Sequence, residues 1–484
     1  MSLDIAPRFV SGNAASAPVA PALECLMRQL PAEALLSGDG IDARFRETLS
    51  AVPAVMPAFV MRPRNAAEVS LCLAACDAVR QPVAVQGGRT GFHGGERACA
   101  GEAVLSLEHM TGLSAVDPAG GTLSAEAGVP LQAVQEAADH AGMFFGVDIG
   151  SRGSATIGGN VATNAGGIRV LRYGMFRAQV LGLEAVLADG TILTSLKGLA
   201  KDNSGLDLNQ LFIGSEGTLG VVTRACLKLH PKPAAECAAF CAVPSLSAAI
   251  ALLARLRAAL GPLLSACELI FPDALEGALA LTGAPRPVAP AAFYVLAELH
   301  AIHPAHDTDG FSAALMAAHE DGMISDVTVS QSPREFRALW DLREACSGYI
   351  LTLRNVIGCD VAVPPAKIEA FVPDAARIVQ ALDPAARFPV FGHLGDGNLH
   401  YVVETDRPQG VVEAIYRCVQ GLGGSISAEH GIGIDKKPYL HFCRSGAEIA
   451  AMRRLKRAFD PNNILNPGRI FDPLPTTPAQ GAAA

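Results

Sequence analysis

The chain has 484 residues, a formal net charge of −9 at pH 7 and a sequence pI near 5.8. Half of the residues are hydrophobic and 48 are glycine, a composition typical of a globular protein of two or three domains rather than a fibre or a disordered chain. No block rich in lysine and arginine is present, so a nucleic acid is not expected as a partner.

The 12 cysteines are scattered and form no CxxC pair. Two pairs with a spacing of four, Cys72/Cys76 and Cys237/Cys241, are predicted to be core residues. Together with the lack of a secretory signal, this pattern predicts free thiols and a cytoplasmic protein.

The first half of the chain predicts a tail, a helical segment and then a mixed α+β domain. Residues 1–52 begin as an Ala/Ser/Pro-rich tail and continue as LECLMRQL, which has apolar residues at helical spacing. In residues 53–232, strands are expected in PVAVQGG, AVLSLEHM and GVVTRACLKLHP, and an Asp-Gly hairpin in LGLEAVLADGTIL. A helix is expected in PLQAVQEAADHAG, ending at Gly142.

The second half predicts another domain and a closing segment. Residues 233–420 alternate strands with long helices, and the apolar stretch Cys237 to Ala254 is predicted to be a strand followed by a Ser-capped helix rather than a membrane span. Residues 421–470 are glycine-rich at first and then contain the helix EIAAMRRLKRAF. Residues 471–484 are predicted to be a flexible tail.

Two histidines flank an Asp-Gly pair in FGHLGDGNLHY, Phe391 to Tyr401. With Asp396 and Gly397 as a two-residue turn, His393 would lie opposite His400, and both imidazoles could reach one cation. The alternative is an ordinary hairpin with two partly buried histidines.

Three glycine-rich segments stand out in the first domain: residues 85–96, 151–174 and 212–222. Glycines let backbone N–H groups approach phosphate oxygens, and small hydroxyls such as Ser154 add donors. Neither a GxxxxGK[ST] loop nor a Rossmann fingerprint is present. Tight structural turns would explain one such loop, but three in one domain indicate a large phosphate-bearing cofactor.

These segments, with AEHGIG and LNPGR further on, resemble the vanillyl-alcohol oxidase / p-cresol methylhydroxylase superfamily. Within it, GGRTGFHGG, ATIGGNVATNAGG, GSEGTLG and FGHLGDGNLH are similar to the FAD-linked D-2-hydroxyacid dehydrogenases, which include D-lactate and D-2-hydroxyglutarate dehydrogenases. The resemblance covers residues 53–470. It implies an α+β fold with a two-part FAD-binding domain (53–232), an α/β substrate (cap) domain with an antiparallel sheet (233–420) and a segment that closes the active site (421–470).

The resemblance also implies which residues contact FAD. They are Gly87, Gly88, Arg89, Thr90, Gly91, Ser154, Thr156, Gly158, Gly159, Ala165, Gly166, Glu216, Gly217, Val221 and Asn466. Relatives that attach FAD covalently through the first loop use a histidine that would align with Thr90. Here the nearby histidine is His93, three positions further on, so non-covalent FAD is expected.

The motif AEHGIG adds a carboxylate and a third histidine. Two histidines and one carboxylate form an open ligand set for Zn²⁺, Mn²⁺ or Fe²⁺. Neighbouring side chains in an extended segment point apart, which suits Glu429 on the metal and His430 on the substrate. The resemblance implies the same assignment: His393, His400 and Glu429 as ligands, with zinc as the expected metal, His430 as the base and Asn398 beside the substrate.

Substrate recognition is expected to depend on Arg343, which aligns with the arginine that binds the substrate carboxylate in D-2-hydroxyglutarate enzymes. The alternative is a helix-surface arginine paired with Asp341 or Glu344. Those enzymes also carry a threonine and a lysine where this chain has Ser347 and Gly358. This difference favours a monocarboxylic D-2-hydroxy acid such as D-lactate, unless Lys436 or Lys437 supplies the missing cation.

The reaction implied is oxidation of a D-2-hydroxy acid to the 2-oxo acid, with hydride transfer to flavin N5. An electron-transfer flavoprotein or a quinone is expected as the acceptor because no NAD fingerprint is present. No transmembrane segment is expected, and the sequence is compatible with a homodimer. The alternatives are an alkyl-dihydroxyacetonephosphate synthase-like transferase, a subunit of a glycolate oxidase-type complex, and a zinc hydrolase, which would leave the glycine loops unexplained.

Overall fold

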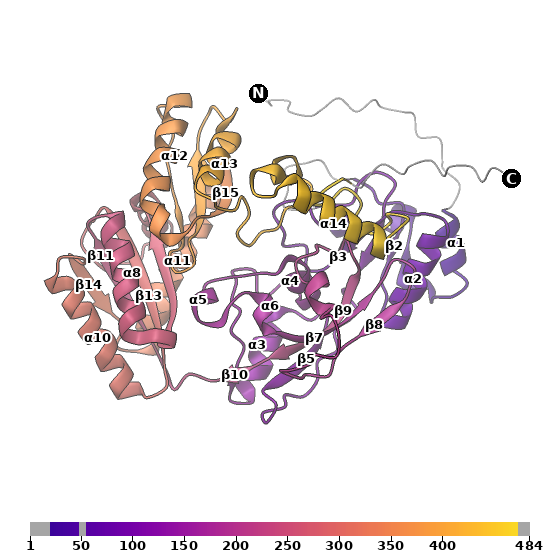
Figure 1. Cartoon of the computed structure of the whole chain (residues 1–484), viewed down its shortest axis with the longest axis horizontal. Helices are drawn as coiled ribbons and strands as arrows, with labels where there is room; N and C mark the ends of the chain where they lie inside the picture. The colour runs from indigo at the N-terminus through magenta and orange to yellow at the C-terminus, as the bar shows by residue number, and fades with distance from the viewer. Residues whose placement is uncertain (1–19, 48–54, 473–484) are drawn as a thin grey trace.

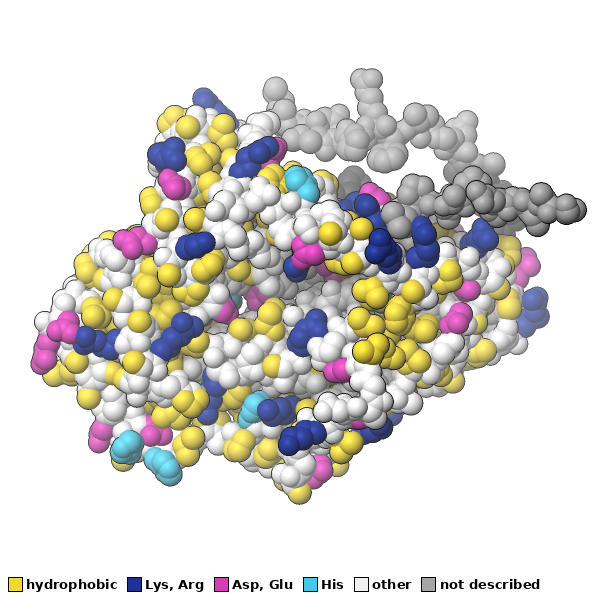
Figure 2. Space-filling view, in the orientation of Figure 1, with side chains coloured by type: hydrophobic (Ala, Val, Ile, Leu, Met, Phe, Trp, Pro, Cys, Tyr) yellow, Lys and Arg dark blue, Asp and Glu magenta, His cyan; other side chains and the backbone are white. Residues whose placement is uncertain are grey.

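The computed structural model describes residues 20–47 and 55–472, so most of both predicted tails lies outside the described residues. The chain folds into two lobes (Figure 1). One lobe contains the two four-stranded sheets and receives the C-terminal helix, and the other is built on one large sheet. Lys and Arg side chains are spread over both lobes on the face shown in Figure 2, rather than gathered in one block.

The helical segment expected up to residue 52 is shorter than predicted. Only α1 (Pro21–Leu26) is α-helical, and it is followed by 3-10 turns at Ala32–Ala34, Gly38–Gly40 and Ala43–Phe45 and by the two-residue strand β1 (Leu35–Leu36). Pro31 and the left-handed Gly38 (φ +53°) interrupt the helical pattern. The rest of the predicted segment, from residue 48, lies outside the described residues.

The first sheet has the strand order β1-β2-β4-β3. Strands β2, β4 and β3 are parallel, while β1 is antiparallel to β2. Cys72 and Cys76 belong to the core between this sheet and α2, so the prediction of core positions is confirmed for this pair. The bounds are β2 (Val60–Met61), α2 (Ala66–Ala78), β3 (Val83–Gln86) and β4 (Ala103–Ser106).

The second sheet is antiparallel, with the order β5-β9-β7-β8, and α3 and α4 pack on its core face. The hairpin expected at Asp189–Gly190 joins β7 to β8, and α3 ends just before Gly142, as predicted. β6 and β10 form a separate two-stranded sheet. The bounds are β5 (Thr122–Glu126), α3 (Leu131–His140), β6 (Met143–Phe144), α4 (Ile157–Thr163), α5 (Val170–Tyr173), α6 (Phe176–Gln179), β7 (Val180–Val186), β8 (Ile192–Thr194), α7 (Asn209–Phe212), β9 (Val221–Lys228) and β10 (His230–Pro231).

The large sheet has seven antiparallel strands in the order β14-β11-β13-β12-β16-β17-β15, which confirms the antiparallel sheet expected for the cap domain. One face packs against α8, α10, α12 and α13, and the other against α9 and α11. The strands are β11 (Ala235–Val243), β12 (Leu264–Ile270), β13 (Phe293–Ala301), β14 (Asp326–Val329), β15 (Val356–Ala362), β16 (Phe391–His393) and β17 (Asn398–Glu404). The helices are α8 (Leu246–Leu260), α9 (Pro272–Thr282), α10 (Pro304–Glu320), α11 (Pro333–Thr352), α12 (Ile368–Leu382) and α13 (Val411–Gly421).

The expected strand and Ser-capped helix are β11 and α8, because the Ser245 hydroxyl accepts a hydrogen bond from the N–H of Ala248 at 3.1 Å. Cys237 and Cys241 lie in β11, in the core as predicted. Among the described residues, one segment, Leu246–Leu263, is long and apolar enough by composition to cross a membrane. Its apolar stripe packs onto the sheet, and a core helix of a soluble protein meets the same criterion.

The end of the chain returns to the first lobe. Helix α14 (Gly446–Phe459, yellow in Figure 1) begins with a Ser445–Glu448 capping box. The ammonium group of Lys456 donates hydrogen bonds to the carbonyls of Thr218 and Leu465. Asp460 accepts from the N–H groups of Ile464 and Leu465, so the segment after the helix is fixed against the glycine loops.

Candidate active site

The histidine hairpin forms with a register that differs from the predicted one. His393 pairs with Asn398, and His400 pairs with Phe391. The loop has four residues because the N–H groups of Asp396 and Gly397 both bind the carbonyl of His393. A shift of two residues leaves the side chains on the same face, so His393 and His400 become diagonal neighbours, with ring centroids 5.3 Å apart.

Three imidazoles converge on the carboxylate of Glu429. Its Oε1 lies 3.7 Å from Nε2 of His393, 3.8 Å from Nε2 of His400 and 3.7 Å from Nε2 of His430. Its Oε2 accepts the N–H of Gly167 at 2.8 Å, which ties the cluster to the second glycine loop. Burial alone would raise the pKa of Glu429, but the three histidines hold it at about 2.

Asp360, at the end of β15, fixes the segment that carries Glu429 and His430. One of its oxygens accepts the N–H groups of Ala428, Glu429 and His430 at 3.0, 3.0 and 3.1 Å. The other accepts the side-chain amide of Asn398 at 2.8 Å. The carboxylate is buried, and the surrounding cations and amides hold its pKa well below the ordinary value against the opposing effect of burial.

Possible metal-binding atoms of Asp360, His400, Glu429 and His430 lie within 4.8 Å of one another, so this group lacks the predicted ligand His393 and contains Asp360 and the predicted base His430. The oxygens of Asp360 are occupied by backbone and amide N–H groups, and they face the Nδ1 atoms of His400 and His430 at 3.8 Å. The Nε2 atoms of both rings point the other way, toward Glu429. Asp360 therefore lies behind the rings of His400 and His430, and Glu429 lies in front of them.

Glu268 on β12 contacts two predicted site residues. Its carboxylate lies 2.8 and 3.0 Å from Nδ1 of His393 and accepts Nε–H of Arg343 at 2.8 Å. Arg343 is therefore buried and is not the helix-surface residue of the alternative. Burial lowers the pKa of an imidazole, but Glu268 outweighs it and holds the pKa of His393 well above its ordinary value.

The other predicted substrate residues lie in different surroundings. Ser347 is exposed on α11, one turn beyond Arg343. Asn398 donates to Asp360 and to the carbonyl of Val361, and buried Lys436 donates to the carbonyl of Ile426. Lys437 pairs with Asp472 at 2.7 Å. Both lysines are engaged in contacts within the chain.

Most of the predicted cofactor residues lie in three loops that border β3, α4 and β9. Gly87 to Gly91 follow β3, Ser154 to Gly166 surround α4, and Glu216 to Val221 lead into β9. A Cβ on Gly88 would lie 2.1 Å from the carbonyl of Ser154, and one on Gly87 would lie 2.7 Å from Oγ1 of Thr156. Glycine is therefore required for the first two loops to approach this closely.

Several buried polar atoms in these loops have no hydrogen-bond partner within the described part of the chain. They are Nη1 of Arg89, Nε2 of His93, Oε1 of Glu96, Oγ1 of Thr156 and Nδ2 of Asn160. Buried polar groups in folded proteins are normally paired, so this concentration fits a polar ligand between the first and second loops. The residues present thus fit a large phosphate-bearing cofactor.

Three predicted cofactor residues support the loops through their side chains. Both carboxylate oxygens of Glu216 accept backbone N–H groups at 2.7 Å, from Ile432 and Gly433, so this side chain holds the turn after His430. Asn466 accepts from Val85 at 2.8 Å and donates to the carbonyl of Glu216 at 2.6 Å, which joins the first and third loops. The side chain of Val221 lies in the hydrophobic core.

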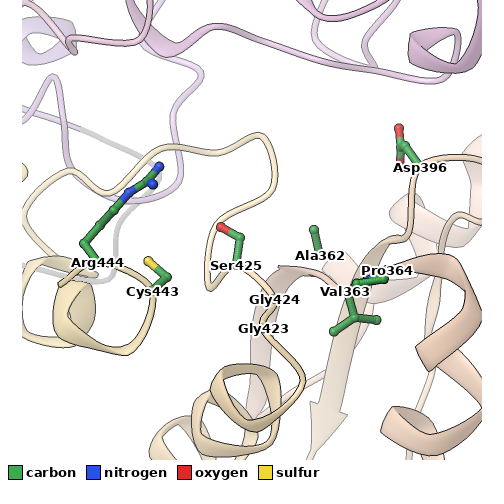
Figure 3. A pocket seen from close by; sticks show the side chains of 9 residues that line it. All are labelled: Ala362, Val363, Pro364, Asp396, Gly423, Gly424, Ser425, Cys443 and Arg444. Carbon is green, nitrogen blue, oxygen red and sulfur yellow. The ribbon is translucent and has the colours of Figure 1, made fainter. Parts of the chain in front are cut away.

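A cavity of about 390 Å³ lies beside the hairpin turn (Figure 3). Figure 3 shows Cys443 and Arg444 of the C-terminal segment at one end, Ala362 and Asp396 toward the other, and Ser425 between them. The residues that line it include Asp396, whose pKa burial raises to about 6, but none of the predicted metal ligands. The cavity is therefore separate from the histidine cluster.

Glu268 and Asp360 are the two site residues that the sequence did not identify. Each is a single carboxylate inside an apolar strand, in LSACELI and in CDVAV. A charged residue at a core position of a strand is rarely buried without a partner. This signal could have marked both as site residues, although it does not give their partners.

Comparison with known proteins shows two family matches along the chain. Residues 57–195 match the FAD binding domain, and residues 232–470 match the C-terminal domain of FAD linked oxidases. The chain is 38% identical over 423 residues to mitochondrial D-2-hydroxyglutarate dehydrogenase of Bos taurus, covering 86% of this chain and 77% of that protein. It is 39% identical over 433 residues to D-2-hydroxyglutarate dehydrogenase of Xanthomonas citri pv. viticola, covering 86% and 89%.

Solved structures share the fold at low sequence identity. The structure of p-cresol methylhydroxylase with substrate bound matches with a TM-score of 0.73 at 16% identity, over 93% of this chain and 96% of that one. A structure of alkyldihydroxyacetonephosphate synthase matches with a TM-score of 0.73 at 17% identity, over 96% and 88%. At this identity the likeness extends to the fold alone.

The cytoplasmic location expected from the sequence is wrong. The similar proteins from Bos taurus, Oryza sativa, Danio rerio and Schizosaccharomyces pombe are all named as mitochondrial, and this finding overturns the cytoplasmic expectation. The expectation rested on free cysteines and a missing secretory signal, and both features are equally compatible with a mitochondrial protein.

Proposed function

Because the chain belongs to the FAD-linked D-2-hydroxyacid dehydrogenases of the vanillyl-alcohol oxidase / p-cresol methylhydroxylase superfamily, we propose that it oxidises a D-2-hydroxy acid at a metal site made by His393, His400 and Glu429. The observation that carries the proposal is the convergence of three Nε2 atoms on one oxygen of Glu429, at 3.7–3.8 Å. A cation that binds nitrogen and oxygen at about 2 Å fits between atoms at this separation.

The two bound groups would supply the redox and Lewis-acid parts of the reaction, with FAD as the acceptor of a hydride from C2 and the divalent cation lowering the pKa of the substrate hydroxyl. Zinc is the proposed cation, with manganese or iron as alternatives for this ligand set. A Cβ on Gly166 would lie 2.9 Å from Oε2 of Glu429, and the N–H of Gly167 donates to the same oxygen, so the second glycine loop, which would hold part of the FAD, contacts a proposed metal ligand.

The residues of the chain would perform the remaining steps. His430 Nε2, which faces Glu429, would take the hydroxyl proton as the C2–H bond breaks and the C2–O bond becomes a carbonyl. Asp360, 3.8 Å from Nδ1 of His430, would orient the ring and stabilise its protonated form. Arg343 would bind the substrate carboxylate. An electron-transfer flavoprotein or a quinone would then reoxidise the flavin.

The proposed substrate is a monocarboxylic acid such as D-lactate, with D-2-hydroxyglutarate as the second candidate. Gly358 stands where the D-2-hydroxyglutarate enzymes carry a lysine, and nothing lies within 4 Å of a Cβ at this position. Lys436 and Lys437 bind other groups of the chain, which supports a site without a cation for a second substrate carboxylate. The second candidate is favoured by the names of the similar bovine and Xanthomonas proteins, while a Schizosaccharomyces pombe relative at 36% identity carries the name of a D-lactate dehydrogenase.

The direct test is anaerobic bleaching of the bound flavin by hydroxy acids. D- and L-lactate, D- and L-2-hydroxyglutarate, glycolate and D-malate are added in turn, with and without prior EDTA treatment. We expect fast bleaching by a D-acid, D-lactate first, and its loss after EDTA with recovery on adding Zn²⁺. A flavin that no acid bleaches would contradict the proposal and favour a transferase of the alkyl-dihydroxyacetonephosphate synthase type.

We also propose that FAD is bound without a covalent link. Thr90 stands where covalently linked relatives have the attaching histidine, and the ring of His93 packs beside His430 with a centroid distance of 5.9 Å. Acid precipitation of the purified protein is expected to leave the yellow colour in the supernatant. Colour that stays in the washed pellet would contradict this prediction.

A further inference from the structure

We propose that Glu268 is a positioning residue that orients two parts of the site at once: the metal ligand His393 and the substrate-binding Arg343. The inference rests on the proposed function, because it assumes the roles given to these two residues. The sequence does not reveal the partners of Glu268, and the assignment comes from the contacts of its carboxylate.

The register of the large sheet places Glu268 beside His393. β12 pairs with β16 so that Glu268 and His393 are directly opposite, which puts both side chains on the same face of the sheet. All seven residues of β12 are buried, and Glu268 is completely shielded from solvent. A carboxylate in such a place requires partners to offset the loss of hydration.

One partner is Nδ1 of His393, which lies within hydrogen-bond distance of both carboxylate oxygens, at 2.8 and 3.0 Å. This contact places an Nδ1 proton toward Glu268 and leaves Nε2, 3.7 Å from Oε1 of Glu429, as the nitrogen that would bind the metal. A carboxylate in this place behind a histidine ligand fixes the tautomer and ring orientation and typically strengthens metal binding about 10–100-fold.

The other partner is Arg343. Its Nε donates to Oε2 of Glu268 at 2.8 Å, and its guanidinium lies over the ring of Phe391, 4.8 Å from the centroid. Nη2 is 2.6 Å from the same oxygen, but it has no hydrogen-bond acceptor in suitable alignment within the described part of the chain. The guanidinium is thus held on one edge and retains donor capacity for a substrate carboxylate.

A second buried glutamate provides a matched control. Glu298 on the neighbouring strand β13 is also completely buried and pairs with Arg169, Nε to Oε1 at 2.8 Å and Nη2 to Oε2 at 3.1 Å. Its other partners are Ser265 and His300, and none of them is a predicted metal ligand. Loss of its charge therefore tests the effect of breaking a buried ion pair in this sheet without touching the metal site.

The experiment measures the Zn²⁺ dissociation constant of the EDTA-treated flavoprotein by competition with a chromophoric chelator, in Glu268→Gln, Glu298→Gln, Arg343→Met and the double variant Glu268→Gln/Arg343→Met. We expect Glu268→Gln to weaken Zn²⁺ binding about 10–100-fold. Glu298→Gln is expected to bind Zn²⁺ like the unaltered protein, and Arg343→Met no more weakly. Arg343→Met should instead raise the KM for the hydroxy acid.

The double variant guards against misfolding of Glu268→Gln, because it removes both charges of the buried pair together. It should bind Zn²⁺ as weakly as Glu268→Gln. Zn²⁺ constants for both Glu268 variants within twofold of the unaltered protein would overturn the inference, as would an equal loss in Glu298→Gln. Absence of Zn²⁺ binding in the unaltered protein, or binding that His393→Ala does not weaken, would overturn the proposed function itself.

Discussion

Replacing His430 by alanine is expected to lower the rate of flavin reduction by the hydroxy acid about 10²–10⁴-fold, the usual contribution of a positioned general base. The imidazole is the only one of the three around Glu429 not assigned to the metal, and Asp360 sits 3.8 Å behind its Nδ1. The variant should retain FAD and Zn²⁺ at the stoichiometry of the unaltered protein. Stopped-flow bleaching of the flavin measures the rate, and absorption and metal analysis measure the contents.

A matched control for this variant is His230→Ala. His230 is a partly buried histidine on β10 whose Nε2 contacts Oε1 of Gln179 at 2.9 Å, far along the chain from the predicted base. Bleaching at the normal rate in this control and slow bleaching in His430→Ala would assign the effect to the base. A His430→Ala protein that bleaches within threefold of the normal rate would remove His430 from this role.

Of the variants described, Asp360→Ala is expected to lose the most stability. It is also expected to lose both metal binding and activity. The change leaves three consecutive, partly buried N–H groups, of residues 428–430, without their acceptor, and it removes the counter-charge of Lys436, whose Nζ lies 4.0 Å away. Breaking a buried charge pair costs about 3–5 kcal/mol. Thermal unfolding and Zn²⁺ titration of the purified variant measure the two effects.

Asp383→Ala is the control for this variant. Asp383 is also a buried aspartate in the lobe built on the large sheet, but its hydrogen bonds come from neutral groups, the Thr405 hydroxyl and the N–H of Ala385. Its loss should destabilise the protein less than the loss of Asp360 and leave Zn²⁺ binding intact. An Asp360→Ala protein that unfolds and binds Zn²⁺ like Asp383→Ala would contradict the orienting role of Asp360.

Local patterns predicted much of the fold because they depend on neighbours in the sequence. The strand at Val83–Gln86, the hairpin between β7 and β8 and the Ser-capped α8 are all determined by alternation, an Asp-Gly turn or a capping hydroxyl. The helix predicted beyond Leu26 was wrong. Apolar spacing over eight residues does not show that the following Pro31 and Gly38 favour 3-10 turns.

Sequence motifs predicted which residues meet at the site but not how they are paired. His393, His400 and Glu429 converge as expected, yet the hairpin register was wrong by two positions, since the turn is fixed by bonds to the His393 carbonyl rather than by the Asp-Gly pair. Contacts such as Glu268 to His393 join residues 125 positions apart. No sequence periodicity encodes such a pair, because it depends on which strands become neighbours in the sheet.

The hydrogen bond between Val85 and Asn466 joins residues 381 positions apart, and Val83 pairs with Leu465 beside it. A ribosome reaches Asn466 only after it has made both lobes, so the strand that leads into the first glycine loop receives this support at the end of synthesis. A premature stop codon between residues 431 and 465 would leave every predicted metal ligand and the base in the product. It would nevertheless remove Asn466, which joins the first and third loops, so the shortened product would lack the hydrogen bonds that hold these two cofactor loops together.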